Sequence, residues 1–127
     1  MHAILVAVSP PSQSKLHALL DGQDADYFES YEDATEALGR RRYAVAVVGL
    51  HFGESRMFEF VREVKRRRPE ARVLCVQGTS GHLGDGTVSG LRTALELLGA
   101  EGVIDLSRLS AEDCRALAHL LRLPAPA

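Results

Sequence analysis

The sequence lacks the features that mark membrane, secreted and nucleic-acid-binding proteins. It has no tryptophan and only two cysteines, Cys75 and Cys114, and its formal charge is −2. Such a small charge creates no broad field that would attract nucleic acid. The apolar run at residues 3–8 is too short to cross a membrane or to form the core of a signal peptide. We therefore expect a cytoplasmic protein with two reduced thiols and no contact with membrane or nucleic acid.

What the sequence does contain is enough for one globular domain. Its 127 residues are 46% hydrophobic and 25% charged, which is the balance of a soluble protein with a buried core. We predict that this domain covers residues 1–123. Residues 124–127 alternate proline and alanine, which cannot continue a helix, so we interpret them as a tail or the start of a linker.

Short apolar runs alternate along the chain with longer segments of helical period. The short runs are typical of parallel strands covered on both faces, and the longer segments place apolar residues three and four apart. This alternation predicts an α/β fold of the (βα)5 type, with helices on both faces of a parallel sheet. The expected strands are residues 4–8, 25–29, 44–48, 73–76 and 102–105, and the expected helices are residues 15–20, 34–41, 58–65, 91–98 and 111–121.

Polar residues mark several of the expected helix ends. Ser30 precedes Asp33, and Ser110 precedes Asp113, with the spacing of a capping box at the start of a helix. Arginine and lysine crowd residues 40–42 and 65–68, at the expected ends of two helices. We interpret these clusters as solvated charges that complement the helix dipoles and not as a DNA-binding patch, because no recognition motif accompanies them.

The segments YEDATEAL (31–38), YAVAVV (43–48) and GAEGVI (99–104) resemble parts of response-regulator receiver domains. The first two are similar to the second helix and third strand of that family, and the last to the turn and fifth strand. The spacing agrees over nearly the whole chain. The resemblance implies a flavodoxin-like three-layer sandwich with sheet order 2-1-3-4-5. It also implies a site at the carboxyl ends of strands one, three, four and five.

The residues of receiver phosphorylation chemistry are replaced at the matching positions. These positions are Val8 and Ser9 for the magnesium-binding acidic pair, Gly49 for the acceptor aspartate, Gln77 for the serine or threonine, and Leu106 for the lysine, or Asp105 if the register is shifted by one. Neutral side chains do not supply the charged oxygen ligands that Mg²⁺ prefers. The chain thus resembles a degenerate receiver, or pseudo-receiver, and we expect no phosphorylation on aspartate, no enzymatic activity, and no metal or cofactor.

Three nearby residues could in principle supply a replacement chemistry. His51 follows the third expected strand, Asp85 lies in a glycine-rich segment, and Arg108 follows the fifth strand. A lone histidine on a loop is usually a surface residue, Asp85 could accept a phosphoryl group only if its segment folded over the sheet, and Arg108 has no phosphoryl acceptor to neutralise. We therefore expect structural roles for all three.

Residues 78–90 are longer than the usual receiver connection and contain five glycines. We interpret this segment as a mobile connector over the strand ends. Glycine-rich loops ahead of a helix can also hold phosphate, so a phosphate or nucleotide site is the alternative, although neither common phosphate-binding motif is present. The candidate residues are Gly78, Thr79, Ser80, Gly81, His82, Gly84, Asp85 and Gly86.

Two functions of different class remain open. The first is a non-catalytic signalling or adaptor domain that binds a partner protein, or a second copy of itself, through the fourth helix, fifth strand and fifth helix, as the resemblance implies. The second is a small-ligand-binding domain that uses the glycine-rich segment. The candidate interface residues are Arg92, Leu95, Asp105, Arg108 and Arg115.

Overall fold

A computed structural model describes residues 3–20, 23–49, 54–77, 85–106 and 117. Five parallel strands form one sheet in the order β2-β1-β3-β4-β5. This confirms the predicted sheet order and flavodoxin-like topology. The strands are β1 (Ala3–Ala7), β2 (Asp24–Phe28), β3 (Val45–Gly49), β4 (Arg72–Gln77) and β5 (Val103–Asp105), and the helices are α1 (Pro10–Leu19), α2 (Tyr31–Arg40), α3 (Glu54–Arg67) and α4 (Asp85–Leu97).

The burial of each strand follows from its place in the sheet. Strands β1 and β3 lie at the centre, consist of small and branched apolar residues, and are buried along their whole length. Strand β2 forms one edge, is half-buried, and carries the charged residues Asp24 and Asp26. Strand β5 forms the other edge and has only three residues. The near-continuous apolar runs in the sequence therefore mark the central strands correctly.

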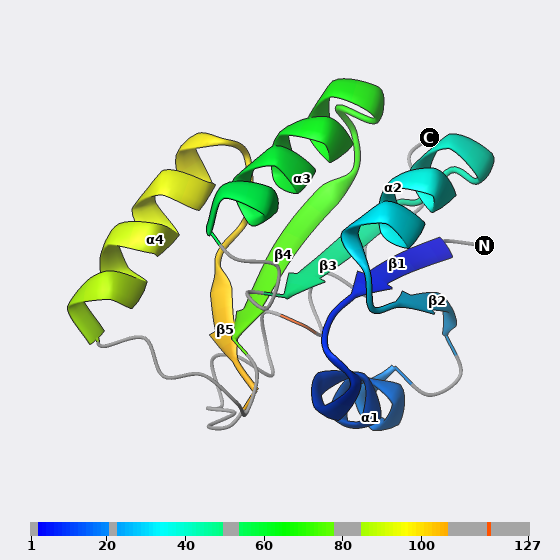
Figure 1. The fold of residues 1–127 in the computed structure, drawn as a ribbon, viewed down its shortest axis with the longest axis horizontal. Coiled ribbons are helices and arrows are strands. Elements are labelled where there is room, and N and C mark those ends of the chain that lie inside the picture. The colour runs from blue at the N-terminus through cyan, green and yellow to red at the C-terminus, as the bar shows by residue number, and fades with distance from the viewer. Residues whose placement is uncertain (1–2, 21–22, 50–53, 78–84, 107–116, 118–127) are drawn as a thin grey trace.

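Helices α2, α3 and α4 cover one face of the sheet, and α1 covers the other (Figure 1). Alternate residues of each strand point to opposite faces. Leu5 of β1 and Cys75 of β4 thus join Phe60 of α3 in one core cluster. Val6 of β1 and Leu16 of α1 join Leu117 in the other. The result is the predicted three-layer sandwich, and within its described part no helix is long and apolar enough to cross a membrane.

All four described helices begin earlier in the chain than predicted, and α1 and α4 differ most. Helix α1 begins at Pro10, five residues before the expected start, because proline fixes a φ angle that suits the first turn. Helix α4 begins at Asp85, so the second half of the predicted glycine-rich loop is helical. Burial of Leu91 and Leu95 in the same helix explains why tertiary packing outweighs the low helix propensity of the glycines.

Helix α4 ends in a turn at Gly99, the first residue of the segment 99–104 that resembles receiver domains. Gly99 has a φ of 109°, which favours glycine. The Ala100 N–H donates to the Leu95 carbonyl at 3.0 Å, and the Gly99 N–H donates to the Glu96 carbonyl at 3.0 Å. These two bonds form a Schellman motif. A Cβ at residue 99 would also lie 2.9 Å from Cε of Lys65, so this turn brings the ends of α3 and α4 together.

Candidate functional site at the carboxyl edge of the sheet

The five positions that match the receiver phosphorylation site lie at one edge of the sheet. Strands β1, β3, β4 and β5 are parallel, so their carboxyl ends lie at the same edge, where Gly49 pairs with Val76 and Gln77 pairs with Asp105. Val8, Gly49 and Leu106 are buried, and Gln77 is only 8% exposed. Ser9 is half-buried. The edge that these residues form is shielded and largely apolar.

Side chains of α1 donate hydrogen bonds to backbone carbonyl groups at this edge. The Lys15 ammonium donates to the Leu106 carbonyl at 2.8 Å, and the Gln13 amide donates to the Val8 carbonyl at 3.1 Å. The Ser9 hydroxyl donates to the buried Ser12 hydroxyl at 3.2 Å. Each bond satisfies a polar group at the end of β1 or β5 from within the protein. Helix α1 thus ties the two strand ends together from one side of the sheet.

The charges at this edge do not form a cation site. At the ends of β1, β3, β4 and β5, Asp105 is the one carboxylate among the described residues, and it is half-buried. Elsewhere in the described ranges, no three histidine, cysteine, aspartate or glutamate side chains gather in a way that could hold a metal ion. Hard cations such as Mg²⁺ need several oxygen ligands, usually including carboxylates. The described side chains therefore lack the donor set for such an ion.

Cys75 lies on β4, opposite Val48 of β3 and one layer below the strand ends. It is a free, buried cysteine, as predicted, and burial raises the pKa of its thiol to about 12. Because the thiolate is the nucleophilic form, this thiol is unreactive at neutral pH. Its role is to fill the core below the edge.

The predicted interface residues lie in different surroundings, and Asp105 is half-buried at the end of β5. Leu95 is fully buried in the core, which contradicts its proposed part in an interface. The apolar period of α4 explains this, since Leu91 and Leu95 lie four residues apart on the face against the sheet. Arg92 is exposed, and its guanidinium donates to the Val103 carbonyl at 3.0 Å, so it joins α4 to β5. Arg108 and Arg115 lie outside the described residues.

The glycine-rich segment is only partly described. Asp85 and Gly86 form the first turn of α4, which corrects the prediction that the connection runs to residue 90. Gly78, Thr79, Ser80, Gly81, His82 and Gly84 lie outside the described residues, as does His51 after β3.

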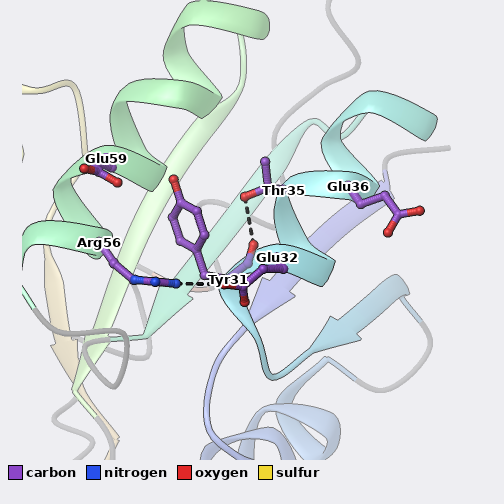
Figure 2. A pocket seen from close by; sticks show the side chains of 6 residues that line it. All are labelled: Tyr31, Glu32, Thr35, Glu36, Arg56 and Glu59. Carbon is purple, nitrogen blue, oxygen red and sulfur yellow. Dashed lines mark hydrogen bonds and ion pairs between the residues drawn. The ribbon is translucent and has the colours of Figure 1, made fainter.

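A second feature, a groove between α2 and α3, was not predicted from the sequence (Figure 2). It has a volume of about 730 Å³ and is lined by Tyr31, Glu32, Thr35, Glu36, Arg56 and Glu59. The Arg56 guanidinium pairs with the Glu32 carboxylate at 2.9 Å and lies 5.2 Å from the centre of the Tyr31 ring. This hydrogen-bonded guanidinium lowers the pKa of Glu32. The groove depends on how two helices pack, and no local sequence signal reveals that packing.

Gln13 and Lys15 on α1 were also missed as residues of this edge, because the predicted helix began only at residue 15. The signal that could have found them is the pair Pro10 and Pro11 directly after Ser9, which is typical of a helix start. With that start, Gln13 and Lys15 fall in the first two turns, near the strand ends.

Comparison with known proteins supports the fold at the level of the backbone. A response regulator from Thermotoga maritima superposes with a TM-score of 0.77 at 14% identity, over 97% of this chain and 99% of that one. The signal receiver domain of a DNA-binding response regulator from Colwellia psychrerythraea gives 0.70 at 18% identity, over 97% and 100%. A beryllofluoride-activated NtrC4 receiver domain, solved as a dimer, gives 0.69 at 17% identity, over 94% and 96%. No family model and no curated protein matches the sequence. The chain therefore has the fold of response-regulator receiver domains.

Proposed function

We propose that this protein is a pseudo-receiver, a non-catalytic signalling or adaptor domain that acts by binding protein and is not phosphorylated on aspartate. The observation that carries the proposal is the buried Gly49 at the end of β3, in a sheet with the receiver fold. A glycine has no side chain to accept a phosphoryl group. Val8 and Leu106 are buried apolar residues at the neighbouring strand ends, where a metal ligand and a lysine would be needed.

The contacts of α1 support the view that the carboxyl edge of the sheet keeps one conformation and does not switch between two. A receiver that responds to phosphorylation needs an accessible acceptor and charged groups that change their partners. Here the Lys15 ammonium and the Gln13 amide are already bound to the carbonyls of Leu106 and Val8. We propose that this arrangement holds β1, β5 and α1 in one conformation, so that the domain presents a constant surface in the cytoplasm.

The proposed binding surface consists of α4 and β5. On α4, the apolar side chain of Leu97 is 84% exposed, and Arg92 is also exposed. Asp105 lies at the end of β5, on the adjoining strand. The NtrC4 receiver domain forms a dimer, which supports protein contact as a use of this fold. We propose a partner protein or a second copy as the occupant.

The test is incubation with acetyl phosphate and Mg²⁺, read by intact-protein mass spectrometry beside an active receiver domain. We expect the active domain to gain one phosphoryl group and this protein to gain none. The variant Gly49→Asp should also remain unmodified, because the ends of β1 and β5 would still lack metal ligands and a lysine. A phosphoryl adduct on the unaltered protein would overturn the proposal.

A further inference from the structure

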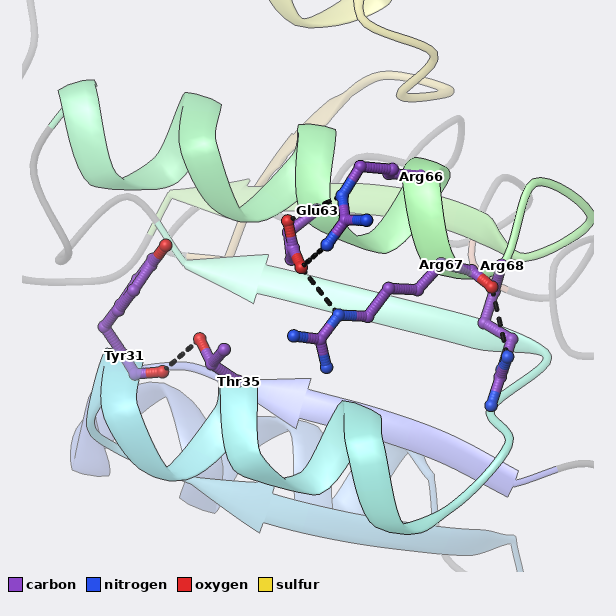
Figure 3. Close-up of polar contacts among 6 residues, drawn as sticks. All are labelled: Tyr31, Thr35, Glu63, Arg66, Arg67 and Arg68. Atoms are coloured by element: carbon purple, nitrogen blue, oxygen red, sulfur yellow. Dashed lines mark hydrogen bonds and ion pairs between the residues drawn. The ribbon is translucent and has the colours of Figure 1, made fainter.

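The outer surface of α2 and α3 carries opposite charges at its two ends. We call this surface the α2–α3 face. Its acidic end contains Glu32, Glu36 and Glu59, which line the groove in Figure 2, and the exposed Asp33 in the first turn of α2. Its basic end contains Arg40 at the end of α2, Arg42 just after it, and residues 66–68 at the end of α3, part of which Figure 3 shows. Both helices follow parallel strands, so their like ends lie together (Figure 1).

The outermost charges of the two ends are far enough apart to act separately, whereas Glu36 and Arg40 pair with each other where the two ends meet. Arg40 lies eight positions after Glu32, and Arg66 lies seven positions after Glu59. With a helix rise of about 1.5 Å per residue, each separation is about 10–12 Å. This exceeds the Debye length of about 8 Å at physiological ionic strength. A molecule that approaches the face therefore meets a negative region and a positive region and not a neutral average.

The groove at the acidic end already holds one guanidinium. Arg56 bonds to the Glu32 carboxylate and lies over the Tyr31 ring, which are the two contacts that a guanidinium favours. Glu36 and Glu59 line the same groove and are exposed. Of the three carboxylates in the lining, Glu32 pairs with Arg56 and Glu36 pairs with Arg40, which lies outside the groove. The charge of the lining and its aromatic wall suit a further guanidinium from another molecule.

At the basic end, the arginines have two different roles. Arg67 points toward α2, bonds to Glu63 at 2.6 Å, and would lie 3.5 Å from a Cβ at Gly39, so it helps to join the two helices (Figure 3). The side chains of Arg40 and Arg66 are 73% and 67% exposed. Arg40 pairs with Glu36, and Arg66 pairs with Glu63. A guanidinium has five donors, so both arginines retain donors for a partner molecule.

We propose that the α2–α3 face is an interface between two copies of this chain, packed antiparallel about a two-fold axis. Such an axis reverses the helix direction, so the basic end of each copy lies against the acidic end of the other, and the favourable contact occurs twice. Arg66 of each copy faces Glu59 of the other, and Arg40 approaches the groove. A basic partner of another kind would use only the acidic end, whereas a second copy satisfies both ends.

The association should be weak and sensitive to salt, because it rests on exposed charges. We would measure the mass of the intact chain by sedimentation velocity at low ionic strength and in about 1 M salt, where the Debye length is about 3 Å. We expect a concentration-dependent dimer at low ionic strength and a monomer in high salt. A protein that stays monomeric at both salt concentrations would overturn the proposal. This holds even if the monomer binds a basic peptide.

Charge reversal locates the interface. We expect Glu59→Arg alone and Arg66→Glu alone to shift the equilibrium to monomer, and their equimolar mixture to restore the dimer. The matched control is Glu96→Arg on α4, which changes the net charge equally but lies off the face. It should dimerise normally and should fail to rescue Arg66→Glu. A dimer that survives both reversals would refute this interface. A dimer that is lost only in Leu97→Glu would assign the contact to α4 instead. Both outcomes would leave the pseudo-receiver proposal intact.

Discussion

At the scale of single residues, a network of charged and polar groups lies at the β2 edge. One carboxylate oxygen of Asp26 accepts bonds from the Tyr43 hydroxyl at 2.7 Å and from the Arg41 guanidinium at 2.8 Å. Arg41 also pairs with Asp24. Among the described strands, β2 pairs with β1 alone, so these bonds tie it to the segment that leads into β3. Hydrogen bonds from Tyr43 and Arg41 lower the pKa of Asp26 below its ordinary value of 3.8.

This shift predicts a dependence of stability on pH. Because the folded state lowers the pKa of Asp26, its stabilisation is complete above pH 4 and is lost as the pH falls through the folded-state pKa. Asp26→Asn should lower the free energy of unfolding by about 1 kcal/mol at pH 7, a modest amount because the side chain is partly exposed. The difference should shrink toward pH 3 in urea unfolding experiments. The exposed Glu70→Gln is the control, and an Asp26→Asn effect that stays constant with pH would contradict the assignment.

At the scale of elements, local signals predicted some boundaries and missed others. The capping pattern at Ser30 is confirmed, since the Asp33 N–H donates to the Ser30 hydroxyl at 3.1 Å and α2 begins at Tyr31. The start of α4 was missed because glycines suggest a loop, whereas the burial of Leu91 and Leu95 decides the outcome. Where contacts with other elements decide whether a residue is helical, a short stretch of sequence does not predict the helix boundary.

The Ser30 cap makes a direct prediction for α2. Ser30→Ala removes the acceptor for one of the unpaired N–H groups in the first turn and should cost about 1 kcal/mol. Thermal unfolding should show a melting temperature lower by about 3–5 °C for a domain of this size. Ser30→Asp keeps an acceptor at the same position and should match the unaltered protein. Equal melting temperatures for all three proteins would show that the cap contributes nothing to stability.

At the scale of the whole molecule, the sequence predicted the topology but not the contacts between its layers. Alternation of strand and helix patterns determines a parallel sheet with few possible orders, and the resemblance to receivers selects one of them. The bond from Lys15 to the Leu106 carbonyl joins residues 91 positions apart, and the groove at Tyr31 and Arg56 needs two helices at a definite angle. Such contacts depend on packing geometry, which no single segment encodes.

The position of each strand in the sheet predicts how the whole molecule opens. Strands β1 and β3 are paired on both sides and fully buried, so their amides should exchange hydrogen only through global unfolding. Strand β2 is half-buried and is paired on one side among the described residues, so it should exchange faster through local opening. Native-state hydrogen exchange measured at increasing, sub-denaturing urea checks this. The free energies for β1 and β3 should equal the global value from urea unfolding, and those for β2 should be smaller and nearly independent of urea. Equal protection of β2 and β3 at low protein concentration would mean that β2 unfolds only with the core, and the edge would then be as stable as the centre of the sheet.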